Sequence, residues 1–229
     1  MKLRFSLIET KAGHFARDES GTTLVEFAMS ISLFLLILFA IMDFARLGYN
    51  WVVTEKAMQR AVRIAAVRPP VCAGVPIYHS RDPGASTTYG AGTNCGTDGG
   101  ICTQVDVQCL LSNPDGGSTD AQDTADEMWA ALQDLMPEGT NEANILLQYS
   151  YDRRLGFIGG PYVPVITAQV VGASNGNGFD ELPFTFVTPL SSLAATAGAS
   201  SSGSIPGTIP FPAISVTLPA EDMNQGMNG

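Results

Sequence analysis

The sequence predicts an α+β fold in which one long N-terminal helix packs on an antiparallel sheet, with a second, short helix beside it. Three observations lead to this fold class. An uncharged apolar run from Phe27 to Met42 continues into a stretch with helical periodicity, an acidic segment near residue 125 has a helical apolar spacing, and four later segments read as strands. With 229 residues and 45% hydrophobic residues, the chain can bury a core.

The first element is a transmembrane segment preceded by a leader. Residues 1–21 mix basic and acidic side chains without an apolar period, so we expect them to form a polar leader. A helix over residues 24–44 would be about 31 Å long, enough to cross a bilayer, and we place the transmembrane segment at residues 22–44. A cleaved secretory signal fits less well, because the apolar run starts late and no Ala-x-Ala-like site follows it.

The helix is expected to continue beyond the membrane as an amphipathic segment over residues 45–68. Apolar positions recur at spacings of three and four, with Thr54 filling one gap, and they predict a face that packs on the protein's own sheet: Phe44, Leu47, Trp51 and Met58. The sequence "RPP" at residues 68–70 should end the helix, because proline disfavours helical geometry in the residue before it. One helix from Thr22 to Val67 is therefore predicted.

Residues 69–229 are expected to form an extracytoplasmic domain held by disulfides. Its four cysteines lie in a Gly-rich stretch: Cys72, Cys95, Cys102 and Cys109. If "CTQVDVQC" is one strand, its two cysteines lie roughly 23 Å apart, too far to be bonded, so each would pair with one of the other two. Disulfides imply an oxidising compartment outside the cytoplasm.

The rest of this domain is predicted to contain the second helix and an antiparallel sheet. "STDAQDTADEMWAALQDLMPEG" has a polar start, an apolar face and a Pro-Gly stop, which is typical of a helix. The predicted strands are "NILLQYSY", "YVPVITAQVV", "FTFVTPL" and "FPAISVTL". The segment from Ser191 to Ser204 is rich in Ala, Ser and Gly and is expected to be a flexible excursion.

Charge and motifs exclude several functions. Beyond residue 68 the chain has sixteen Asp and Glu but only three basic residues, Arg81, Arg153 and Arg154. This negative charge argues against a nucleic-acid partner, which requires a basic surface. His79, in the apparent surface turn "HSRDPG", is the only histidine beyond the leader, and no Cys-x-x-Cys is present, so we expect no enzyme activity, no cofactor and no metal. Calcium binding by the acidic residues stays open, although they lack EF-hand spacing: Asp115, Asp120, Asp123, Asp126 and Glu127.

The stretch "SGTTLVEF" resembles the processing site of prepilins of the tight-adherence class, in which a glycine precedes a Glu-Phe pair and an apolar helix. Together with "DFARLGY", "EKAMQRAVRIAA" and a cysteine-containing loop, it is similar to TadE-like pseudopilins. The resemblance makes Gly21 the last leader residue and Thr22 the first mature one. Glu26 is then the fifth mature residue, followed by Phe27. The resemblance is specific over residues 19–66 and architectural beyond them.

The resemblance implies a pilin-like fold and a minor pseudopilin that acts as an assembly subunit of a tight-adherence pilus. A prepilin peptidase would cut after Gly21, and Glu26 would then pair with the new amine of Thr22 and later with a neighbouring subunit. The implied partners are the peptidase, other pseudopilins, the major pilin and the inner-membrane assembly platform, in a hetero-oligomer. Counts of Lys and Arg do not orient the helix, so the inner-membrane placement with an outer C-terminal domain follows from the family and the cysteines.

Two alternatives stay open. The chain would be a single-pass anchored extracytoplasmic enzyme or binding domain unrelated to pili if its distal domain held a catalytic or ligand site. Glu26 would in that case only extend to the membrane interface.

Overall fold

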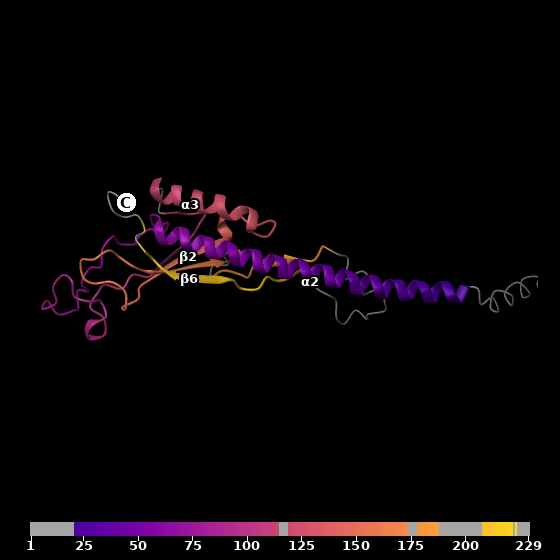
Figure 1. Ribbon diagram of the computed structural model, residues 1–229, viewed down its shortest axis with the longest axis horizontal. Coiled ribbons are helices and arrows are strands. Elements are labelled where there is room, and N and C mark those ends of the chain that lie inside the picture. Colours follow the sequence, from indigo (N-terminus) through magenta and orange to yellow (C-terminus); the bar gives the residue numbers. More distant parts are fainter. Residues whose placement is uncertain (1–20, 115–118, 174–177, 188–207, 222, 224–229) are drawn as a thin grey trace, which may run out of the picture. The chain divides into compact units, whose positions relative to one another are not determined.

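The computed structural model describes residues 21–114, 119–173, 178–187, 208–221 and 223. They form an α+β fold (Figure 1) whose helices are α2 (Thr22–Val67) and α3 (Thr119–Leu132), with short 3-10 turns η2 (Thr97–Gly99), η4 (Gln133–Leu135) and η5 (Glu142–Asn144). The strands are β1 (Val107–Leu110), β2 (Ile145–Ser150), β3 (Val165–Val170), β4 (Pro183–Thr185), β5 (Thr208–Pro210) and β6 (Ser215–Pro219). Two compact units are distinguished: the membrane unit, Met1–Arg46 with Thr185–Thr208, and the distal unit, Leu47–Phe184 with Ile209–Gly229.

Helix α2 has the bounds that the sequence predicts. It begins at Thr22 and ends at Val67, just before Arg68 and two prolines. The last carbonyls of an α-helix have no hydrogen-bond donor within the helix. One of them in α2 accepts hydrogen bonds from residues near the C-terminus. The backbone N–H groups of Glu221 and Met223 donate to the carbonyl of Ala66 at 3.0 and 3.3 Å.

The distal unit is built on a four-stranded antiparallel sheet in the order β1-β2-β3-β6. The register pairs Leu147 with Ala168 and Tyr149 with Ile166, so these residues share one face, and all four are fully buried. The opposite face carries Gln148, Thr167 and Thr217, with a hydrogen bond of 3.0 Å between the two threonine hydroxyls, but it also holds Leu146, which is 8% exposed. Side chains alternate between the two faces along each strand, so one face is apolar and the other is mixed.

The buried face of the sheet is tied to the end of α2. The N–H of Val71 donates to the hydroxyl of Tyr149 at 3.2 Å, and Cys72 is bonded to Cys109 of β1. Burial raises the pKa of Tyr149 to about 12, which keeps this hydroxyl neutral. Arg68 forms a salt bridge with Glu127 of α3 at 3.0 Å. In Figure 1, α3 and the C-terminal part of α2 are drawn on the same side of β2 and β6.

The predicted packing face of α2 is correct only in its C-terminal part. Met58 is fully buried and Leu47 is partly buried, but Trp51 is 43% exposed and Phe44 is 60% exposed. In the distal unit, the buried α2 residues extend from Thr54 to Ala66. A six-residue strand is about 20 Å long, the rise of about 13 helical residues, so a sheet of this length covers only that stretch.

Several predicted strands are shorter than expected. Of "CTQVDVQC" only the last three residues lie in a strand, β1 (Val107–Leu110), and Cys102 forms an isolated bridge with Arg81. The "FTFVTPL" segment contributes only β4, which pairs with β5 in a separate two-stranded sheet that the sequence did not predict. The rest of that segment from residue 188, the leader residues 1–20 and the excursion at residues 191–204 lie outside the described residues.

Both disulfides join cysteines that are not on one continuous strand. Cys72 pairs with Cys109 at a Cα separation of 5.4 Å, and Cys95 pairs with Cys102 at 5.1 Å. The expectation that Cys102 and Cys109 are not bonded to each other therefore agrees with the structure. Its premise was wrong, since residues 102–106 lie outside β1.

Candidate functional site

The first candidate site is the start of α2, where the sequence predicts the processing point. Gly21 is exposed and lies immediately before the helix, whose first residue is Thr22. A Cβ added to Gly21 would meet no atom within 4 Å, so the fold itself does not require a glycine here.

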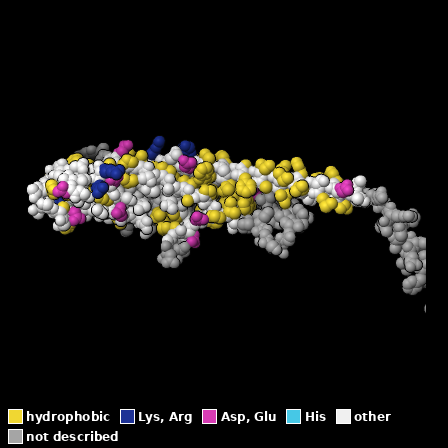
Figure 2. All heavy atoms as spheres, turned by 90° about the horizontal axis from the view of Figure 1, so that it is seen from below, with side chains coloured by type: hydrophobic (Ala, Val, Ile, Leu, Met, Phe, Trp, Pro, Cys, Tyr) yellow, Lys and Arg dark blue, Asp and Glu magenta, His cyan; other side chains and the backbone are white. Residues whose placement is uncertain are grey.

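The first turns of α2 display their side chains. Glu26 is exposed and Phe27 is 65% exposed, and most of the large apolar residues that follow are exposed as well. The helix contains an 18-residue window with mean hydropathy 2.5, none of it buried, so its length and composition suit a membrane span. Figure 2 shows hydrophobic side chains gathered along this helix. A single apolar N-terminal helix of this kind fits a single-pass membrane anchor.

A contact at the end of the apolar run was missed by the sequence analysis. Asp43 is only 2% exposed, although Met42 and Phe44 on either side are 56% and 60% exposed. The N–H of Val187 donates to Asp43 Oδ1 at 3.4 Å, and Arg46 donates to the carbonyl of Thr185 at 3.2 Å. The signal that could have indicated it is a carboxylate directly after sixteen uncharged residues, which needs a partner.

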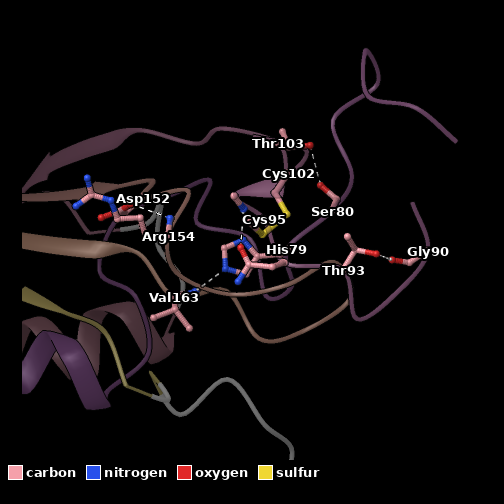
Figure 3. Close-up of a disulfide and its surroundings, with 12 residues drawn as sticks. His79, Ser80, Gly90, Thr93, Cys95, Cys102, Thr103, Asp152, Arg154 and Val163 are labelled. Atoms are coloured by element: carbon pink, nitrogen blue, oxygen red, sulfur yellow. Dashed lines mark hydrogen bonds between the residues drawn. A yellow bond between two sulfur atoms is a disulfide. The ribbon is translucent and has the colours of Figure 1, made fainter. Parts of the chain in front are cut away.

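The second candidate site surrounds His79 in the distal unit. The expected surface turn is present at Pro83 and Gly84, which are exposed, but His79 itself is only 2% exposed. Its Nε2 accepts from the N–H of Val163 at 3.2 Å, and its ring lies 4.8 Å from that of Tyr162. In Figure 3, His79 lies beside the Cys95–Cys102 disulfide, with Val163 joined to its ring by a dashed line. Burial lowers the pKa of His79, so the ring is neutral near pH 7.

The hydrogen bond at His79 fixes its tautomer. A ring nitrogen that accepts from a backbone N–H carries no proton, so the proton of the neutral ring is on Nδ1, which has no hydrogen-bond partner. Gly156 lies against the ring with φ +80°, and a Cβ there would come within 2.2 Å of Nε2. The backbone thus closes around His79 on one side, and the geometry leaves no approach for a substrate from that direction.

Of the residues that the structure describes, one group of three metal-ligating types has its ligand atoms within 4.8 Å of one another: His79, Cys95 and Cys102. Both sulfurs are bonded to each other, and a disulfide sulfur is not the thiolate that a metal requires. The acidic residues of α3 form no such group, and Asp115 lies outside the described residues. The cluster therefore serves as a disulfide-stapled core.

Comparison with known proteins links the first site to a family. Residues 21–63 match the family model described as TadE-like protein. No curated protein and no solved structure matches the chain. The match begins at Gly21 and ends within the buried part of α2, so it covers the start of the helix, Glu26 and the apolar run. Residues 21–63 of this chain are thus similar to TadE-like proteins, as the "SGTTLVEF" motif predicted.

Proposed function

We propose that this chain is a minor pseudopilin, a non-catalytic subunit that is processed by a prepilin peptidase and takes part in assembly of a tight-adherence pilus. The observation that carries the proposal is the start of α2. The helix begins at Thr22, the family match begins one residue earlier, and Glu26 is exposed one turn into the helix.

Processing would give Glu26 its role. A cut after Gly21 creates a charged amine on Thr22, four residues before Glu26 and therefore on the same helix face. The carboxylate also interacts favourably with the positive end of the helix. When α2 packs beside the helix of another subunit, Glu26 exchanges this partner for the amine of its neighbour, where less water strengthens the pair.

The distal unit would face the oxidising side of the inner membrane. Its two disulfides require that compartment, and the mostly acidic domain they staple follows the membrane segment directly. The partners are then the prepilin peptidase on the cytoplasmic side, and other pseudopilins, the major pilin and the assembly platform in the membrane.

Substitution of Gly21 tests the processing step. Gly21→Leu should leave the leader attached while the chain still inserts into the membrane, because a Cβ at this position meets no atom within 4 Å and the larger side chain is expected to obstruct the peptidase. Gly48→Leu is a matched control, since a Cβ at Gly48 also meets no atom within 4 Å. Immunoblotting that shows normal shortening of Gly21→Leu would remove the main support for the proposal.

Substitution of Glu26 tests the assembly step. Glu26→Ala should be inserted and cut normally, while cross-linking to pilin subunits and surface piliation fall sharply. Glu26→Asp keeps the charge and should retain most of the piliation. Full piliation by Glu26→Ala would mean that this carboxylate only reaches the membrane interface.

A further inference from the structure

In the distal unit, the side of α2 that points away from the core carries a row of basic side chains. Lys56, Arg60 and Arg63 are exposed and follow one another at spacings of four and three residues, which puts them on one side of the helix. The fully buried Met58 and Ala65 lie on the opposite side. Two exposed valines extend the row, and we call these five residues the basic stripe: Val52, Lys56, Arg60, Arg63 and Val67.

The cations of the basic stripe are not neutralised within the part of the chain that the structure describes. The one salt bridge among those residues joins Arg68 to Glu127, and none involves the stripe. Lys56 donates instead to the side-chain oxygen of Gln59 at 3.3 Å. Like charges three or four residues apart on a helix repel each other, so carboxylates from another molecule would stabilise this part of α2.

Helix α3 of the same unit exposes the complementary charges. Asp120, Asp123 and Asp126 are exposed at spacings of three residues, whereas Met128 and Leu132 on the other side of α3 are fully buried. The positive end of the helix favours an acidic residue in the first turn, such as Asp120, but this effect fades beyond that turn and does not account for the other two. We call the three aspartates the acidic face.

The two surfaces have matching lengths. Lys56 and Arg63 are seven residues apart, which is about 10 Å along a helix, and Asp120 and Asp126 are six residues apart, which is about 9 Å. Three cations at helical spacing can therefore lie opposite three carboxylates at helical spacing. The basic stripe thus finds its complement in the chain's own sequence.

The basic stripe and the acidic face belong to neighbouring helices. Arg68, the residue after α2, forms its salt bridge with Glu127 of α3 at 3.0 Å, which ties the end of α2 to α3. A surface that holds a basic and an acidic row side by side is self-complementary. If the acidic face of one copy meets the basic stripe of another, a two-fold axis brings the second pair of surfaces together as well.

We propose that two copies of this chain associate through these surfaces, with the basic stripe of each copy on the acidic face of the other. Each of the two contacts places Lys56, Arg60 and Arg63 opposite the three aspartates, and Val52 and Val67 add apolar area at its ends. The association depends on neither the removal of the leader nor a pilus, so it goes beyond the proposed function.

Charge reversal in the full chain, purified in detergent, tests the proposal by sedimentation equilibrium. The parent chain should self-associate, and higher ionic strength should weaken the association. Arg60→Glu with Arg63→Glu, the basic-reversed chain, should raise the dissociation constant by about tenfold or more. Asp123→Lys with Asp126→Lys, the acid-reversed chain, should do the same. An equal mixture of the two reversed chains should associate again, because opposite charges then face each other in both contacts.

A matched control separates this surface from the net charge of the chain. Arg153→Glu with Arg154→Glu changes the net charge as much as the basic-reversed chain does, but its exposed residues follow β2 and lie outside both surfaces. This control should associate as the parent does. If a reversed chain does not fold, as judged by circular dichroism, Arg60→Gln with Arg63→Gln replaces it and should show a smaller loss.

Three results would overturn the proposal. The first is a parent chain that stays monomeric in its micelle, and the second is a reversed chain that associates as tightly as the parent. The third is a mixture of reversed chains that associates no better than either chain alone, because the partner of the basic stripe would then not be a second copy.

Discussion

The two halves of α2 show how one helix meets two different solvents. Between Leu24 and Met42 most of its residues are large and apolar, and most of these are exposed, as Leu24 at 71% and Phe34 at 61% show. Between Thr54 and Ala66 its buried residues are mostly small, and Ala57, Ala61 and Ala65 are completely inaccessible. Large apolar side chains are compatible with a helix surface that contacts lipid. Alanine, in contrast, lets a helix pack closely against its neighbours. The size of the apolar residues, more than their hydrophobicity, distinguishes the two halves.

The largest difference between the halves should appear when a charge is placed in the buried one. Ala61→Asp buries an unpaired carboxylate where no water reaches it, and we expect a loss of more than about 4 kcal/mol in the free energy of unfolding of the distal unit. Arg63→Asp changes an exposed residue of the same helix and should have little effect. Urea unfolding of the detergent-solubilised chain measures both. Equal stabilities would show that this half of α2 is not part of the core.

The two disulfides should contribute unequally to the same unit. The Cys72–Cys109 bond, which starts five residues after α2, closes a loop with a separation of 37, whereas Cys95–Cys102 closes one of 7. The entropy of loop closure in the unfolded chain then predicts how much free energy of unfolding each double variant loses. The loss is about 4 kcal/mol for Cys72→Ala with Cys109→Ala and about 2 kcal/mol for Cys95→Ala with Cys102→Ala. Chemical denaturation of the two double variants compares them. A larger loss from the short loop would point to a role of the His79 surroundings beyond loop closure.

Two large side chains of α2 should differ in the same way as the two halves. Met58→Ala removes a completely buried side chain and should cost about 3 kcal/mol, whereas Trp51→Ala removes one that is 43% exposed and should cost less than about 1.5 kcal/mol. The two melting temperatures, followed by circular dichroism, give the order. A greater loss for Trp51→Ala would restore the packing face that the sequence predicted.

The smallest expected effect is a pH dependence that belongs to the distal unit. Burial lowers the pKa of His79 below its ordinary value of 6.5, so the unfolded chain binds the proton more readily than the native one. Stability should therefore be full above about pH 6.5 and fall as the pH drops below it. Unfolding of the parent chain and of His79→Phe at pH 7.5 and 5.5 measures the difference. An equal fall in both would assign the pH dependence to other groups.

The helices could be predicted closely because their signals are local. The bounds of α2 follow from "GTT" before the apolar run and "RPP" after it. The polar start predicts where α3 begins, but α3 ends at Leu132, five residues before Pro137, with the turn η4 between them. Local patterns do not say where a packing partner ends, however. The apolar spacing of α2 continues unbroken through Trp51, yet in the distal unit complete burial begins only at Thr54. This limit depends on the length of the strands that α2 packs against, and those strands are remote in sequence.

The surroundings of His79 and Asp43 could not be predicted for a related reason. His79 is buried because Gly156 and Val163, some eighty residues later, close over its ring. Asp43 is buried and accepts a hydrogen bond from Val187, which is 144 residues away in sequence. Neither partner has a motif of its own. The candidate processing site, in contrast, lies within a few consecutive residues, so its prediction at Gly21, Thr22 and Glu26 needs only the local sequence.

The N-terminal residue of the chain isolated from its native membrane tests the central claim most directly. The proposed function predicts that mass spectrometry of the terminal peptide will find Thr22, with the sequence TTLVEF, because a cut after Gly21 would leave the whole of α2 in the mature protein. An intact Met1 would contradict the pseudopilin role and leave a simple membrane anchor. A terminus beyond residue 42 would show that the apolar run is a cleaved secretory signal.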